Sequence, residues 1–141
     1  MRRNRVRDVM PLKMVTISAG DTLATAEDIM TFGRVRHMPV VHAGKLVGIV
    51  SERDLLRASL SNLSDFGSDE RRAFLHVVEI KRVMSTPPIV IDPDATVEEA
   101  ARMMAARKIG CLPVVDGDDL IGLITQTDVL RYFAGIPPDR S

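Results

Sequence analysis

The stretch Pro39–Asp54 is Pro-Val-Val-His-Ala-Gly-Lys-Leu-Val-Gly-Ile-Val-Ser-Glu-Arg-Asp, and a matching stretch follows 74 residues later at Pro113–Asp128. In each copy a short polar turn separates two apolar runs, which predicts two antiparallel strands joined as a hairpin. Each second run ends in Ser or Thr, and an Asp follows three residues later. This pattern predicts that a strand passes directly into a helix at Ser51 and at Thr125. We call these two places the corners.

The duplication extends through most of the chain. An offset of 74 aligns residues 6–57 with residues 80–131 without a gap, and 14 aligned positions carry the same residue. Two copies are too few for an open solenoid, so we expect a pseudo-symmetric pair that buries its shared faces. The expected organisation is a tail at 1–5, a first repeat at 6–59, a linker with a connecting helix at 60–79, a second repeat at 80–134 and a tail at 135–141.

Apolar periodicity and capping residues predict the same element order in both copies. A helical turn before Pro11 leads into the first copy, and a helix beginning at Ser68 leads into the second. Each copy then carries a short strand, a helix, two strands and a helix, which makes an α+β fold. The predicted ranges are 15–17, 22–32, 38–42, 46–50 and 52–59 in the first copy, and 89–91, 96–108, 112–115, 120–124 and 126–133 in the second.

Composition narrows the class of function. The chain has 141 residues, with 19 basic and 19 acidic side chains, no Trp and one Tyr, so neither an overall positive field nor a base-stacking surface favours nucleic acid. No apolar run approaches the roughly 20 residues that span a bilayer. The three histidines and the single cysteine lack metal-ligand spacing, so we expect no metal site. We expect a cytoplasmic protein without nucleic-acid or membrane partners.

These residues resemble a pair of CBS (cystathionine beta-synthase-type) domains. The resemblance covers roughly residues 6–134 and is carried by Pro-Val-Val, by Leu-Val-Gly-Ile-Val-Ser-x-x-Asp and by Leu-Ile-Gly-Leu-Ile-Thr-x-x-Asp. It implies two repeats packed sheet to sheet as a Bateman module, which commonly associates into a homodimer. It also implies adenosine-containing ligands, AMP, ADP or ATP ahead of S-adenosylmethionine, bound in clefts between the repeats. The family is regulatory and not catalytic, so the resemblance implies no cofactor, no enzymatic activity and an unknown protein target in a stand-alone form.

The chemistry of the corners agrees with that implication. An ionised carboxylate can accept hydrogen bonds from both ribose hydroxyls, and the start of a helix offers N–H groups to a phosphate. The resemblance places Asp54 and Asp128 at the ribose and the hydroxyls of Ser51 and Thr125 beside them. The same residues also form a capping-box pattern, so a purely structural role remains open.

Further candidates surround the corners. Arg53 stands just before Asp54 where the second copy has Thr127, which predicts unequal sites, with more phosphate preferred in the first. The family often has a small residue before the conserved Pro, and Gly110 fits this pattern while Arg36 departs from it. The flanking segments supply the remaining candidates, His37, Met38 and Pro39 in the first copy, Cys111, Leu112 and Pro113 in the second, and Thr86 before the second copy's first strand.

Three alternatives remain open for these candidates. Arg36 and His37 either meet phosphates or lie in a solvated loop, and Met38 and Leu112 either contact the base or belong to the core. Cys111 is also compatible with an inert buried thiol. For the protein as a whole, the alternative to a nucleotide-binding sensor is a protein-interaction module whose clefts are vestigial.

Overall fold

The computed structural model describes residues 4–60 and 67–140, and the chain divides into two compact units. The first unit is the continuous segment Val15–Pro88. The second unit combines residues 4–14 with residues 89–140. The N-terminal segment therefore belongs with the second copy of the repeat and not with the first. Most of the predicted polar linker, residues 61–66, lies outside the described residues.

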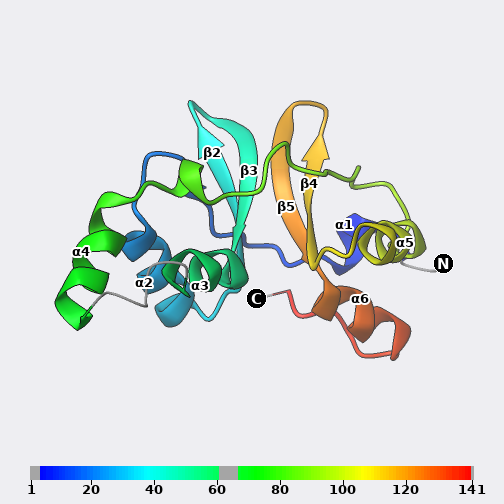
Figure 1. The fold of residues 1–141 in the computed structure, drawn as a ribbon. Coiled ribbons are helices and arrows are strands. Elements are labelled where there is room, and N and C mark those ends of the chain that lie inside the picture. Colours follow the sequence, from blue (N-terminus) through cyan, green and yellow to red (C-terminus); the bar gives the residue numbers. More distant parts are fainter. Residues whose placement is uncertain (1–3, 61–66, 141) are drawn as a thin grey trace. The chain divides into compact units, whose positions relative to one another are not determined.

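The first unit contains a three-stranded sheet in the order β1-β2-β3, and Figure 1 shows its strands β2 and β3 side by side. The short β1 runs parallel to β2, while β2 and β3 form the predicted antiparallel hairpin, with a bulge between Val40 and Val41. The helices α3 and α4 both pack against α2. The elements are β1 (Ile17–Ser18), α2 (Leu23–Gly33), β2 (His37–His42), β3 (Lys45–Ser51), α3 (Glu52–Leu60), α4 (Ser68–Val77) and a 3-10 turn (Ile80–Arg82).

The second unit repeats this plan around a two-stranded sheet. Its hairpin has the same bulge, between Val114 and Val115, and α1 packs against both α5 and α6. The elements are α1 (Val6–Val9), α5 (Val97–Arg107), β4 (Cys111–Asp116), β5 (Asp119–Thr125) and α6 (Gln126–Phe133). The α+β class and the two repeats predicted from the sequence are confirmed.

The two long helices begin and end in the same way. The hydroxyl of Thr22 accepts a hydrogen bond from the Thr25 amide at 3.4 Å, and the hydroxyl of Thr96 accepts one from the Glu99 amide at 3.1 Å. At the other end the predicted range stopped at residue 32, whereas Gly33 is the last helical residue of α2. The left-handed residues are Arg34 (φ 54°) and its counterpart Lys108 (φ 55°).

The strand predicted at 89–91 is reduced to a single parallel bridge between Ile91 and Val114. In the first unit the equivalent strand continues because the Ala19 amide donates to the Val41 carbonyl at 2.9 Å. The position equivalent to Ala19 is Pro93, which has no N–H to donate. One proline therefore removes the third strand from the second sheet.

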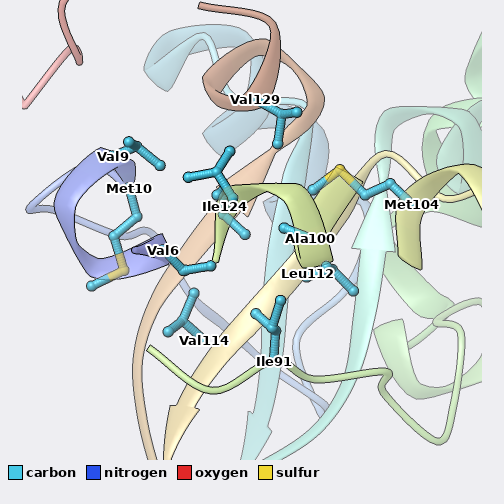
Figure 2. Packing of buried hydrophobic residues seen from close by; sticks show 11 residues of the cluster. Val6, Val9, Met10, Ile91, Ala100, Met104, Leu112, Val114, Ile124 and Val129 are labelled. Carbon is cyan, nitrogen blue, oxygen red and sulfur yellow. The ribbon is translucent and has the colours of Figure 1, made fainter. Parts of the chain in front are cut away.

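Each unit has its own apolar core. Figure 2 shows the second core, in which Val6 and Val9 of α1 lie beside side chains from the sheet and from α5 and α6. Its buried members are Val6, Val9, Met10, Ile91, Val97, Ala100, Met104, Leu112, Val114, Ile124 and Val129. The first core is built from the equivalent elements, with Ile80 of the 3-10 turn as the counterpart of Val6, and it also includes Leu75 of α4. The segment at the start of each sequence repeat therefore packs into the core that the rest of the other repeat builds.

The glycine repeated in each hairpin leaves space for the segment that comes from the other repeat. A Cβ atom on Gly122 would lie 2.6 Å from Sδ of Met10, and a Cβ atom on Gly48 would lie 2.7 Å from the Ser85 carbonyl oxygen and 2.8 Å from Sδ of Met84. Such distances are closer than van der Waals contact, so only glycine leaves room for the methionine. The repeated Met10 and Met84 are therefore packing residues.

Candidate functional site

The two corners have the same local geometry. At the second corner the Thr125 amide donates to Oδ2 of Asp128 at 2.8 Å, and the Asp128 amide donates to the Thr125 hydroxyl oxygen at 3.4 Å. At the first corner the Ser51 amide donates to Oδ2 of Asp54 at 2.8 Å, and the Asp54 amide donates to Oγ of Ser51 at 3.1 Å. Both corners are therefore complete capping boxes. The structural role that the sequence left open is present at both.

A capping box does not use up the carboxylate. In the part of the chain that the structure describes, the hydrogen bonds given for the carboxylates of Asp54 and Asp128 all involve Oδ2. A carboxylate has about four acceptor sites on its two oxygens. Oδ1 of each residue is consequently the atom with acceptor capacity for a ligand.

The starts of α3 and α6 offer fewer N–H groups than we expected. The Glu52 amide donates to the Arg36 carbonyl at 2.8 Å, and the Gln126 amide donates to the Gly110 carbonyl at 2.9 Å. The third amide of each helix, that of Asp54 or Asp128, donates to the corner hydroxyl. Two of the first three N–H groups of each helix therefore already have acceptors.

The same two backbone hydrogen bonds bring the predicted residues around Pro39 and Pro113 to the corners. The carbonyls of Arg36 and Gly110 lie at the helix starts, and the next residues pair in register with the corner residues, His37 with Ser51 and Cys111 with Thr125. The side chains of Met38, Leu112 and Cys111 are buried in the unit interiors. Pro39 and Pro113 are buried as well. This set can therefore offer a ligand mainly backbone atoms, apart from Arg36 and His37.

His37 lies half-buried in the first unit, and burial lowers its pKa below the ordinary value of 6.5. The positive charges of Arg36 and Arg53 act in the same direction, while Asp54 and Glu52 act against it. The imidazole is therefore neutral at pH 7. A neutral His37 donates at most one hydrogen bond, so of the two residues Arg36 is the cation available to a phosphate.

The remaining candidates lie at the surface. Arg53, Thr127 and Arg36 are exposed. Thr86 belongs to the first unit, and its hydroxyl donates to the Val47 carbonyl at 2.9 Å. That bond joins the segment before the second repeat to β3, which is the structural use that a hydroxyl at this position allows.

Asp128 differs from Asp54 in its surroundings. Asp128 is only 8% exposed. This burial raises its pKa, and the charge of Asp139 acts in the same direction, although the hydrogen bonds from Thr125 and the charge of Arg131 oppose the shift. Burying a carboxylate is costly unless it is fully paired. Buried carboxylates with raised pKa values are concentrated at functional sites.

A cavity of about 130 Å³ adjoins Asp128 within the second unit. It is lined by residues of α1, of α6 and of the segment after α6, namely Asp8, Val9, Asp128, Arg131, Tyr132, Ile136 and Pro138. It is smaller than the roughly 300 Å³ at which pockets for whole drug-sized ligands begin, but it can admit one group of a ligand. Sequence reasoning missed all of these residues except Asp128. The one available signal was the identity of Arg57 and Arg131 in the two copies.

Two absences complete the description of residues 4–60 and 67–140. Within these ranges, no group of three or more His, Cys, Asp or Glu residues could hold a metal ion. Nor does any described helix combine the length and the apolar character that crossing a bilayer requires.

Comparisons with known proteins agree with this architecture. The family model for the CBS domain matches residues 6–61 and again residues 80–135. A CBS domain-containing protein of Dictyostelium discoideum is 32% identical over 139 residues, which is 94% of this chain and 96% of that protein. Two further curated relatives are longer, and this chain spans 33% and 22% of their lengths.

Two solved structures have the same fold. The CBS domain pair of protein MJ0100, in complex with 5′-methylthioadenosine and S-adenosyl-L-methionine, superposes with a TM-score of 0.78 at 26% identity, covering 93% of this chain and 96% of that one. CBSX2 in complex with AMP has a TM-score of 0.77 at 26% identity, covering 94% and 97%. With both repeats matched and a relative of nearly equal length, the chain belongs to the CBS-domain family and consists of a pair of CBS domains.

Proposed function

We propose that this protein is a regulatory, non-catalytic module that binds an adenosine-containing ligand at its corners. AMP, ADP and ATP are the first candidates, followed by S-adenosylmethionine. Ligand binding would favour one conformation of the module, and the difference in affinity between conformations would carry the signal. The proposed setting is cytoplasmic, with a homodimer of the module acting on a protein target.

The observation that carries the proposal is Asp128, a buried carboxylate beside a cavity. Its cap bonds use Oδ2, so Oδ1 can accept a hydrogen bond from a ribose hydroxyl. The complexes named for protein MJ0100 and CBSX2 all contain an adenosine group, which supports the same ligand class here. Asp54 would serve the first corner in the same way.

In this proposal the other predicted residues have supporting roles. The Thr125 hydroxyl donates to Oδ2 of Asp128, while the Ser51 hydroxyl accepts from the Asp54 amide, so both complete the capping boxes that hold the acids. The backbone of Met38–Pro39 and of Cys111–Pro113 would face the base. Arg36 and Arg53 would favour additional phosphate at the first corner, whereas Thr127 leaves the second corner without the equivalent cation.

The alternative is a protein-interaction module, and one observation favours it. Leu56 on α3 is 58% exposed, and Leu130 and Phe133 on α6 are 69% and 55% exposed. Leu56 and Leu130 are equivalent positions that carry the same residue in the two copies. Exposed apolar side chains on equivalent helices are typical of contact surfaces. Nucleotides would then leave the melting temperature unchanged.

The deciding experiment is a thermal-shift and calorimetry panel with AMP, ADP, ATP, S-adenosylmethionine, 5′-methylthioadenosine and GMP. A ligand at 100 times its Kd should add about 2.7 kcal/mol to the free energy of unfolding. We expect Asp128→Asn and Asp54→Asn each to remove binding at its own corner. Asp118→Asn is the matched control, because it removes an exposed carboxylate from the β4–β5 turn. If the wild-type protein binds none of these compounds, the proposal is wrong.

A further inference from the structure

The segment that follows α6 forms one wall of the cavity beside Asp128. We call residues 136–140 the strap. Its Ile136 and Pro138 line the cavity, opposite residues of α1 and α6. The sequence predicted a tail here, yet the strap makes specific hydrogen bonds within the second unit.

Two arginines hold the strap in place. Nη1 of Arg140 donates to the Met10 carbonyl at 2.7 Å and to the Arg7 carbonyl at 3.1 Å, at the end of α1. Helix ends have carbonyls that need donors, and the guanidinium supplies one. From the other side, Nη2 of Arg131 donates to the Pro137 carbonyl at 2.7 Å.

These bonds form a weak attachment. Residues 136–139 are exposed, and the side chain of Ile136 is 45% exposed. The arginine bonds all end on neutral backbone carbonyls. Segments with few buried apolar contacts and exposed hydrogen bonds open locally at low cost.

Arg131 is the residue whose bonding is incomplete. Its Nε is buried, and the described residues provide no hydrogen-bond partner for it. Nε and Nη2 point to the same side of a guanidinium and together form the fork that binds a carboxylate or phosphate through two bonds. In this structure Nη2 is bonded to a neutral carbonyl while Nε has no acceptor. An anion on this fork would satisfy Nε and displace the Pro137 carbonyl.

We propose that Arg131 binds the anionic group of the ligand, and that the strap competes with that group for Arg131 and so restrains binding. The inference rests on the proposed function, because Asp128 at the same cavity would hold the sugar. Binding of a nucleotide phosphate would release the strap from Arg131, and the strap would then be the part of the second unit that reports occupancy. Adenosine, which lacks the anion, would leave the bond between Arg131 and Pro137 in place.

The test compares AMP with adenosine by calorimetry on the full chain. Arg140→Ala and a variant ending at Gly135 release the strap, and we expect each to bind AMP about five- to tenfold more tightly, with a smaller change for adenosine. Arg131→Gln should weaken AMP about tenfold or more and abolish the preference for AMP over adenosine. Adding Arg140→Ala to Arg131→Gln should give no further increase in AMP affinity, because the strap and the anion compete for Arg131 itself.

Two controls match the charge changes. Arg102→Ala removes an exposed cation from α5 of the same unit, and Arg57→Gln changes the equivalent of Arg131 in the first unit. Both should leave the strap effect unchanged. Hydrogen exchange of the amides at 136–140 should also accelerate when AMP, but not adenosine, binds the wild-type protein.

The outcomes separate this inference from the proposed function. If the wild-type protein binds AMP through Asp128 while the strap variants bind it equally or more weakly, the strap is not inhibitory and only the proposed function survives. If AMP binds the wild-type protein through Asp128 and binds more tightly after strap removal, both proposals are supported. If no variant, including the one ending at Gly135, binds an adenosine compound, both are overturned.

Discussion

Sδ of Met10 occupies the space that a side chain on Gly122 would need, with only 2.6 Å between the sulfur and the position of a Cβ atom. The equivalent pair is Met84 and Gly48, where the Ser85 carbonyl is equally close. Each methionine comes from the segment that precedes one repeat and packs on the hairpin of the other. These contacts explain why the glycine and the methionine are both repeated.

We expect Gly48→Ala and Gly122→Ala each to reduce the free energy of unfolding by about 1–3 kcal/mol, because both overpack a filled core. Gly48→Ala should cost more, since its new methyl group meets a backbone oxygen that cannot rotate away. Double-mutant cycles by urea denaturation test this reason. Met10→Ala should relieve most of the free-energy cost of Gly122→Ala, whereas Met84→Ala should relieve less of the cost of Gly48→Ala, because the Ser85 oxygen stays in place. Equal coupling energies in the two cycles would contradict the backbone clash.

Asp128→Asn should maintain or raise stability at pH 7, although it removes the proposed ribose acceptor. Burial raises the pKa of Asp128, so the folded state holds its proton more tightly than the unfolded state does. The stability linked to this group is present at low pH and is lost as the pH rises through the folded-state pKa. The advantage of Asn over Asp in melting temperature should therefore shrink on acidification. An advantage that grows towards low pH would show that burial is not the main cause.

His37 should make the first unit sensitive to acid. Its pKa is lowered in the folded state, so the stability linked to it is present above pH 6.5 and is lost as the pH falls through the lower folded-state value. His37→Gln should flatten the melting temperature against pH in the range below 6.5. His42→Gln is the control, because His42 is exposed. If both variants keep the wild-type profile, another group is responsible for the acid sensitivity.

The two hairpin turns offer a reciprocal test of backbone strain. Ala43 has a φ of 51°, and its counterpart Gly117 has a φ of 63°. Left-handed conformations cost non-glycine residues roughly 1–2 kcal/mol. Ala43→Gly should therefore raise the free energy of unfolding, and Gly117→Ala should lower it by about 1 kcal/mol. Strain is the expected cause at Gly117, because no described atom beyond its chain neighbours lies within 4 Å of the new Cβ. Changes of the same sign in the two variants would rule out strain as the cause.

A fragment with residues 15–88 should fold more stably than a fragment with residues 6–59. The first core requires Leu75 and Ile80, which lie beyond the first sequence repeat. Val6, Val9 and Met10, at the start of the shorter fragment, instead belong to the second core. Circular dichroism melts of both fragments provide the measurement. A cooperative transition in the shorter fragment alone would overturn the assignment of these segments.

The sequence predicted the hairpins and helices because strands and helices impose different apolar periods on the chain. It also located the corners, since Ser51 and Thr125 begin helices as expected. It could not reveal the exchange of Met10 and Met84, because each methionine is identical in the two copies and fits either glycine. The loss of the third strand in the second unit could have been read from Pro93, but the apolar run at 89–91 outweighed that signal.

The site was predicted less completely than the fold. Asp54 and Asp128 stand at the helix starts, but the sequence did not distinguish the buried acid from the half-buried one. The surroundings of Asp128 include α1, which is distant from it in the sequence, and the strap, whose return onto α6 no local pattern indicates. Arg131 went unnoticed because an arginine on an amphipathic helix is usually a solvated residue.

If a polypeptide of half this length, with one leading turn and one hairpin, kept the packing seen here, its methionine would contact the glycine of a second copy and not its own. Two such polypeptides could satisfy each other, each inserting its turn into its neighbour. The present chain has the connectivity expected if an ancestral reciprocal dimer became a single gene product, with its partnership preserved by covalent linkage.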